Sequence, residues 1–238
     1  MNTNKNSYTI IYAAVMVVIV AFLLAFVSSA LKPTQDQNEA LDKKKQILAS
    51  LNIRNITEAA DVEAKYDAVI VADMIINANG DVVADGKDKD QAAFLMKNSE
   101  ITPDKLPVYV CNVDGESKYV IPMTGRGLWG GLWGYVAVNA DLQTVYGAYF
   151  SHESETAGLG ALIAEEKFQD QFKGKHLFAG DDSAHVALTV VKHGKVEPGS
   201  ENVQVDGITG ATLTSNGVAS MVNSGLQSYV GYFKSIKK

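Results

Sequence analysis

Cysteine is almost missing from this chain, since Cys111 is its single cysteine in 238 residues. One cysteine excludes an intramolecular disulfide, and it also excludes a metal or iron–sulfur site built from several thiolates. Cys111 continues the apolar run of Val108, Tyr109 and Val110. This pattern predicts a strand residue that faces the core.

Clustered basic residues are also scarce. After residue 31 the chain carries 20 Lys and Arg side chains against 27 Asp and Glu, a net charge of −7. Binding of nucleic acid depends on grouped Lys and Arg, and Lys43 to Lys45 are typical of the solvated face of a helix. The composition therefore predicts no nucleic-acid partner.

Charged residues are absent from Ser7 to Leu31, a run of 25 residues. As a helix this run would be about 37 Å long, more than the thickness of the hydrocarbon layer. Ser28-Ser29-Ala30 resembles a signal-peptide cleavage site, but the apolar run is about twice as long as a usual signal core. We therefore predict a retained transmembrane helix at 7–31, in contact with membrane lipid, after a tail at 1–6. The lysine count leans towards an outside amino terminus.

The rest of the chain predicts an α+β fold with an antiparallel or mixed sheet, because strand patterns follow one another with short turns and few helices between them. Lys32 to Gln37, with Pro33, is expected to be a linker. The expected strands are Tyr66–Ile76, Val108–Val113, Lys118–Pro122, Gly134–Asn139, Thr144–Ser151 and Ala184–Val191, and the expected helices are Asn38–Leu51, Glu165–Phe172 and Asn216–Phe233. A boundary near Pro122 to Arg126 would separate a juxtamembrane helix and front α/β module (32–124) from a glycine-rich domain (125–238).

Residues 206–215, with the sequence DGITGATLTS, are the first segment that suggests chemistry. In the simplest interpretation this is a polar loop in which Thr214 or Ser215 caps the last helix. The same placement puts Thr212 just before a helix N-terminus, where free N–H groups and the helix dipole favour a phosphate. Gly210 and Ala211 leave room for a bulky ligand. Asp206 could orient the threonine hydroxyl or a metal.

Two further segments are unusual. Residues 125–135 hold five glycines and two tryptophans, without the Lys-Ser/Thr of a phosphate-binding loop. They form either a turn with a core strand or a glycine loop that brings Trp129 close to a planar ligand. Residues 152–160 begin with His152, but no HExxH motif or other ligand spacing supports a metal site there.

The first segment resembles Asp-x-x-Ser/Thr-Gly-Ala-Thr, the signature at which a flavin transferase links flavin mononucleotide (FMN) through its phosphate to the last threonine. Residues 155–160 resemble the Glu-Thr-Pro-Gly-Leu-Gly segment of the same FMN-binding family, with Ala157 in place of the proline. The resemblance implies one covalent FMN on Thr212. The other implied cofactor-binding residues are Asp206, Thr209, Gly210, Ala211, Leu213, Thr214, Trp129, Glu155, Thr156, Gly158, Leu159 and Gly160.

Over nearly the whole chain, the order of these segments resembles the C subunit of the sodium-translocating NADH:quinone reductase. That family implies a bacterial inner-membrane protein with a cytoplasmic amino terminus and a periplasmic flavin domain. It also implies an electron relay from iron-holding membrane subunits to the FMN-bearing B subunit, and a flavin transferase during maturation. No catalytic acid–base pair or metal is required. The alternatives are the G subunit of an Rnf-type ion-translocating electron transport complex, a tethered adaptor without cofactor, and a stand-alone flavin reductase.

Overall fold

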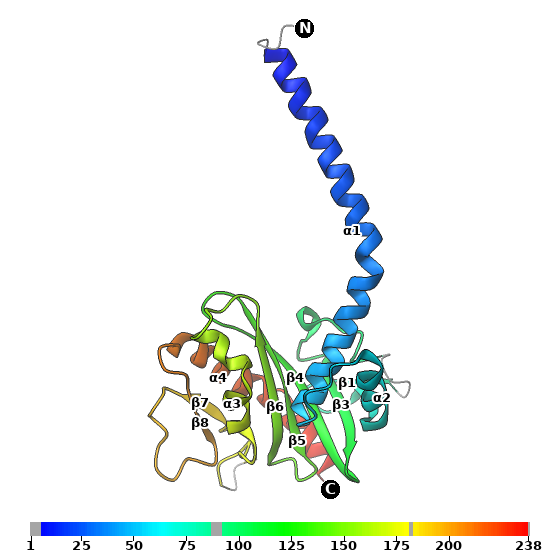
Figure 1. Cartoon of the computed structure of the whole chain (residues 1–238). Helices are drawn as coiled ribbons and strands as arrows, with labels where there is room; N and C mark the ends of the chain where they lie inside the picture. Colours follow the sequence, from blue (N-terminus) through cyan, green and yellow to red (C-terminus); the bar gives the residue numbers. More distant parts are fainter. Residues whose placement is uncertain (1–5, 87–91, 181–182, 238) are drawn as a thin grey trace. The chain divides into compact units, whose positions relative to one another are not determined.

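The computed structural model describes residues 6–86, 92–180 and 183–237 of the chain. It divides into two compact units, Met1–Lys43 and Lys44–Lys238 (Figure 1). Helix α1 (Asn6–Ser50) begins in the first unit and ends in the second. The flavin-type motifs all lie in the second unit.

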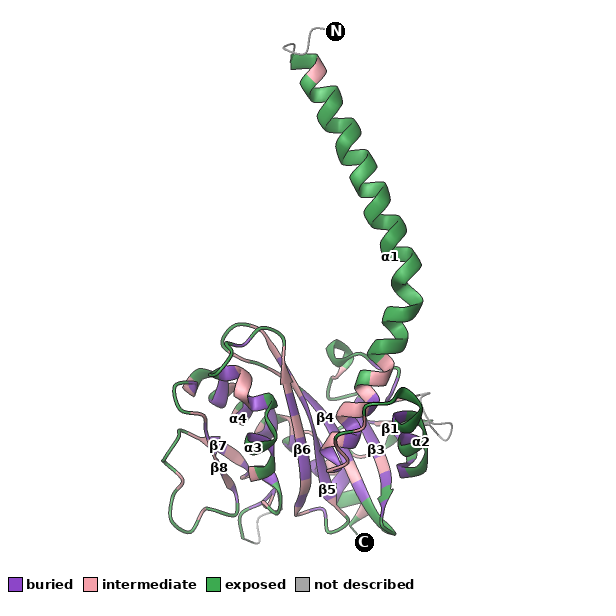
Figure 2. Cartoon of the chain, in the orientation of Figure 1, coloured by how far each residue is buried: buried purple, intermediate pink, exposed green. Residues whose placement is uncertain are grey.

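Helix α1 contains the uncharged run, and the large apolar residues of that run are exposed (Figure 2). By length and composition, it is the one helix among the described residues that could cross a membrane. The linker predicted at Lys32 to Gln37 is wrong, because these residues are helical and Pro33 lies inside α1. A proline removes one helical hydrogen bond. The ion pair between Lys32 and Asp36, 2.6 Å long, spans the turn that contains Pro33.

The second unit is built on a six-stranded antiparallel sheet with the order β2-β1-β3-β4-β5-β6. Its strands are β1 (Ile70–Ile76), β2 (Val82–Gly86), β3 (Leu106–Val113), β4 (Glu116–Arg126), β5 (Gly131–Asn139) and β6 (Val145–His152). Two short strands, β7 (Thr189–Val191) and β8 (Gln204–Asp206), pair in parallel beside this sheet. The α+β fold with a mainly antiparallel sheet is therefore confirmed.

Both faces of the sheet are covered by helices. Helices α4 (Thr212–Gln227) and α5 (Val230–Ile236) bury one face, in a core that includes Val136, Val222 and Leu226. The end of α1 and helix α2 (Ala59–Val69) contribute buried residues such as Ile47 and Tyr66 to the other face. Cys111 is 1% exposed, so its predicted position in the core is confirmed.

Several predicted boundaries change in the structure. The predicted strand at Tyr66–Ile76 begins at Ile70, because Tyr66 to Val69 end α2. Strand β2 was not predicted. Of the strand expected at Ala184–Val191, only β7 forms.

The predicted helices change less. Helix α3 (Glu166–Gln169) and a 3-10 turn to Phe172 occupy the predicted short helix. The last predicted helix is divided between α4 and α5, with Ser228 and Tyr229 between them. The limit between residues 124 and 125 lies inside β4, so one strand joins the two expected modules.

Candidate functional site

The loop from Asp206 to Thr212 connects β8 to helix α4. Asp206 is the last residue of the strand and Thr212 is the first residue of the helix. Between them the chain turns tightly, with a hydrogen bond of 3.1 Å from the N–H of Ala211 to the oxygen of Ile208. Gly210 has a φ of +76°, a conformation that glycine adopts without strain. The turn places the motif threonine at the start of a 16-residue helix.

The predicted caps of α4 are wrong, because the helix begins two residues before Thr214. Ala211 occupies the N-cap position, and its side chain cannot accept a hydrogen bond. The first N–H groups of a helix have no partner within the helix. The start of α4 is therefore an uncapped N-terminus beside the hydroxyl of Thr212.

Thr214 and Ser215 have other roles, and both are buried. The hydroxyl of Thr214 donates a hydrogen bond of 2.5 Å to Oε2 of Glu155. The hydroxyl oxygen of Ser215 accepts one of 3.0 Å from the N–H of Ile208. Ser215 thus fixes the loop against its own helix, and Thr214 fixes the helix against the segment at 152–160.

Glu155 joins all three segments that the sequence analysis singled out. In addition to the bond from Thr214, its Oε1 accepts a hydrogen bond of 2.9 Å from the N–H of Trp129. A Cβ atom on Gly160 would lie 2.5 Å from Oε2 of Glu155, and one on Gly127 would collide with Oε1. These two glycines therefore leave the space that the carboxylate occupies.

The charge of Glu155 is stabilised in this position. Its side chain is 7% exposed, and burial raises the pKa of a carboxyl group. Hydrogen bonds from the Thr214 hydroxyl and from the N–H groups of Trp129 and Gly130 outweigh burial, so the pKa of Glu155 is lowered. An ionised Glu155 is thus the fixed centre of the three segments.

Large apolar side chains are exposed around this centre. The exposed fractions are 47% for Leu128, 66% for Trp129, 41% for Leu159 and 60% for Leu213. Leu159 lies close to the loop, because a Cβ atom on Gly210 would be 3.0 Å from its Cδ2. We call these four residues the apolar collar. Exposed apolar groups that gather at one place commonly mark a binding site.

The segment that carries Leu159 closes on itself. The oxygen of Thr156 accepts hydrogen bonds of 3.1 Å from the N–H groups of Leu159 and Ala161. Gly158 supplies the positive φ of +74° that this turn requires. Ala157, which replaces the usual proline, is exposed. Backbone hydrogen bonds thus hold the loop in place without the proline.

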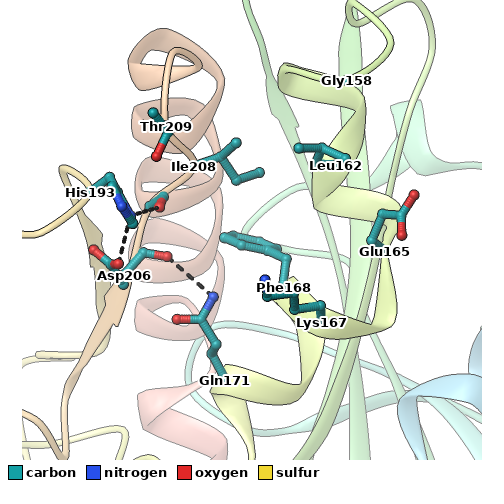
Figure 3. Close-up of a pocket in the computed structure, with 11 residues that line it drawn as sticks. Gly158, Leu162, Glu165, Lys167, Phe168, Gln171, His193, Asp206, Ile208 and Thr209 are labelled. Atoms are coloured by element: carbon teal, nitrogen blue, oxygen red, sulfur yellow. Dashed lines mark hydrogen bonds and ion pairs between the residues drawn. The ribbon is translucent and has the colours of Figure 1, made fainter.

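A cavity of about 500 Å³ lies beside the loop (Figure 3). It is bounded by the segment at 158–171 on one side and by His193 and Asp206 to Thr209 on the other. His193 was not among the predicted site residues, and its Nδ1 lies 2.7 Å from Oδ2 of Asp206. No spacing signal reveals such a pair, because the two residues come from different segments of the chain.

Metal ligands do not gather at this site. Across 6–86, 92–180 and 183–237, no three or more His, Cys, Asp or Glu side chains are placed to hold a metal ion. His152 ends β6, where its Nδ1 accepts a hydrogen bond of 3.2 Å from the N–H of Glu155. His152 therefore supports the loop that carries Glu155.

Comparison with known proteins agrees with this geometry. Residues 127–227 match the FMN-binding domain family. The C subunit of the Na(+)-translocating NADH-quinone reductase of Haemophilus ducreyi is 34% identical, over 91% of this chain and 88% of that protein. The corresponding protein of Pseudomonas aeruginosa is 31% identical, over 93% and 92%.

Solved structures give the same result. The crystal structure of the C subunit of the Na(+)-translocating NADH-quinone reductase from Parabacteroides distasonis has a TM-score of 0.76 and 41% sequence identity, covering 85% of this chain and 96% of that one. Shewanella oneidensis NqrC has a TM-score of 0.68 and 25% identity, covering 84% and 99%. Since the similarity extends along nearly the whole of each chain, this protein belongs to the family of C subunits of the Na(+)-translocating NADH-quinone reductases.

Proposed function

We propose that the chain is the electron-carrying subunit of a membrane sodium-pumping NADH:quinone oxidoreductase, with one FMN joined through its phosphate to Oγ1 of Thr212. The observation that carries this proposal is the uncapped start of α4 at the motif threonine. The family supports an FMN-binding domain, and the relatives are named as subunits of the reductase. The covalent linkage is the part that this chain's own residues support.

The residues at the start of α4 fit a phosphate. The N–H groups of the first helical turn donate hydrogen bonds to an anion, and the helix dipole stabilises its negative charge. Thr212 itself is partly exposed at this N-terminus. Thr209 and Gly210 are exposed beside it, while Ala211 is buried and holds the turn.

The apolar collar fits the flavin ring system. Trp129 exposes a flat apolar surface on the segment bonded to Glu155, and Leu159 exposes a branched one near Gly210. Leu213 follows Thr212 on the helix. The loop that presents Leu159 is shaped by Thr156, Gly158 and Gly160. The Thr214 hydroxyl is bonded to Glu155 and so holds helix α4 against this loop. Bound FMN supplies the redox chemistry, whereas these residues fix its position and its surroundings. Electrons would enter from iron-holding membrane subunits and leave towards the FMN-bearing B subunit.

Attachment needs a separate flavin transferase and flavin adenine dinucleotide (FAD). Oγ1 of Thr212 attacks the phosphorus of the FMN half of FAD and forms a new P–O bond. The P–O bond of the diphosphate breaks, AMP leaves with that oxygen, and the hydroxyl proton passes to solvent. No electrons are exchanged in this step.

We expect covalent flavin only in cells that also express a flavin transferase. Full-length chain from membranes with and without the transferase would be compared by flavin fluorescence on a denaturing gel and by intact mass. Asp206→Ala should lower the yield, because it removes the first residue of the motif. Full labelling of purified apoprotein by FAD alone would contradict the need for a transferase, and a wild-type chain that stays unlabelled would contradict the attachment.

We also expect the flavin domain to be periplasmic. A cysteine at the exposed position Ser235 should react with a membrane-impermeant thiol reagent in cells whose outer membrane alone is permeable. Cys111 will not interfere, because it is buried and burial raises the pKa of its thiol. Thr3→Cys, in the tail expected to be cytoplasmic, is the matched control. The reverse labelling pattern would place the domain in the cytoplasm.

A further inference from the structure

The first residue of the flavin motif, Asp206, has a partner for each of its carboxylate oxygens in the folded domain. Oδ1 of Asp206 accepts a hydrogen bond of 2.7 Å from the N–H of Gly194, and Oδ2 lies 2.7 Å from Nδ1 of His193. The backbone oxygen of Asp206 accepts a hydrogen bond of 3.4 Å from the side chain of Gln171. A flavin transferase that recognises this carboxylate would find both of its oxygens already bonded.

His193 also holds the second residue of the motif. Its Nδ1 lies 3.1 Å from the backbone oxygen of Gly207, as well as beside Asp206 (Figure 3). Both neighbours are hydrogen-bond acceptors, so Nδ1 must carry a hydrogen to bond with them. Nδ1 carries one in the charged ring and in the neutral tautomer that is protonated on Nδ1. One ring nitrogen thus binds the side chain of Asp206 and the backbone of Gly207. We call the contacts of Asp206 with His193 and Gly194 the latch.

Two further motif residues, Gly207 and Ala211, are buried. The N–H of Gly207 donates a hydrogen bond of 2.9 Å to the oxygen of Val191, which extends the pairing of β7 and β8. Ala211 is 7% exposed. Of the five motif positions before Ala211, Thr209 and Gly210 are exposed, Asp206 and Ile208 are partly exposed and Gly207 is buried. In the closed loop an enzyme therefore cannot reach Ala211, and it meets the partly exposed Asp206 side chain only while that side chain is bonded to His193 and Gly194.

We propose that flavin transfer to Thr212 takes place on a locally opened loop and that His193, through the latch, sets how often the loop opens. This rests on the proposed attachment of FMN at Thr212. Segments of a folded protein open locally at a much lower free energy than global unfolding requires. Since the transferase acts on the open form, its rate follows the opening equilibrium. His193 is thus a positioning residue. By holding Asp206 and Gly207 it keeps the loop closed and so slows flavin transfer.

The test measures kcat/KM for flavin transfer to purified full-length apoprotein in detergent, with FAD and transferase. His193→Ala should raise kcat/KM about 3- to 10-fold, the change in an equilibrium constant that corresponds to the net strength of about one hydrogen bond. His193→Asn should keep the wild-type value, because its amide nitrogen is as many bonds from Cβ as Nδ1 is. His193→Gln carries its nitrogen one bond further and should behave as His193→Ala does.

Hydrogen–deuterium exchange of the segment at 206–211 gives a second measurement that does not depend on the transferase. It should be faster in the Ala and Gln variants than in wild type and in His193→Asn. His176→Ala is the matched control, because the His176 ring lies 3.5 Å from Asn202 and apart from the motif. It should change neither measurement.

A wild-type or lower kcat/KM in His193→Ala would overturn the latch. If that variant does not fold, the Asn and Gln variants decide, and equal rates for these two would overturn it. Thr212→Ala serves as the blank. An unlabelled wild-type chain would contradict the proposed attachment itself, whereas a labelled wild type with no effect at His193 would contradict only the latch.

Discussion

Thr212→Ala is expected to remove all covalent flavin while the domain remains folded. Alanine lacks the hydroxyl that forms the phosphoester, and no other residue of the loop occupies the first position of α4. Alanine is also the best helix former, so the free energy of unfolding should change by about 0.5 kcal/mol or less. Fluorescence on a denaturing gel measures the flavin, and circular dichroism measures the fold.

Two matched variants make this result specific. Thr212→Ser keeps a hydroxyl at the same position and should remain labelled. Thr209→Ala changes the exposed threonine of the loop, and this variant should also carry flavin on Thr212, as peptide mass analysis would show. If denatured Thr212→Ala still fluoresces, the acceptor is a different residue and the proposed site is wrong.

Glu155→Ala should have the largest effect on stability, a loss of about 2 to 4 kcal/mol in the free energy of unfolding. It leaves the Thr214 hydroxyl and the N–H of Trp129 without their acceptor. Glu155→Gln should lose only about 1 kcal/mol. Its carbonyl oxygen can still accept from Trp129, and the Thr214 hydroxyl can turn to accept from its amide. Urea unfolding followed by circular dichroism measures both.

The effect of Glu155 should depend on pH in a defined direction. Its pKa in the folded chain lies below the ordinary value of 4.5. The ionised carboxylate therefore stabilises the fold above that pH, and this contribution is lost as pH falls through the lowered pKa. The difference between wild type and Glu155→Gln should shrink below about pH 4.5. Glu153→Ala, an exposed neighbour, is the control, and an equal loss there would contradict the central role of Glu155.

The sequence predicted those features that depend on local patterns. The alternation around Cys111 correctly places it in the core. The Thr212 segment is singled out by its own residues, and the Glu155 segment by its resemblance to the FMN-binding family. The structure brings both together with the segment of Trp129.

Features that depend on distant contacts could not be predicted. Thr214 is a suitable cap by local rules, but its hydroxyl is bonded to Glu155, 59 residues away. Tyr66 and Val69 favour a strand by residue type, yet with Val62 they form the buried side of α2. His193 and Asp206 meet only because β7 and β8 pair in parallel. In each case a tertiary contact overrides local propensity.

The placement of the two tryptophans has an optical consequence. Trp129 and Trp133, the whole tryptophan content of the chain, lie at the hairpin that joins β4 and β5. Trp129 is 66% exposed, while the Trp133 indole donates a hydrogen bond of 3.0 Å to Gln46. Flavins absorb near the wavelengths at which indoles emit, so a flavin on Thr212 would quench this emission by energy transfer. The unlabelled protein thus contains its own donor fluorophores, and loss of its ultraviolet emission would follow cofactor loading in real time.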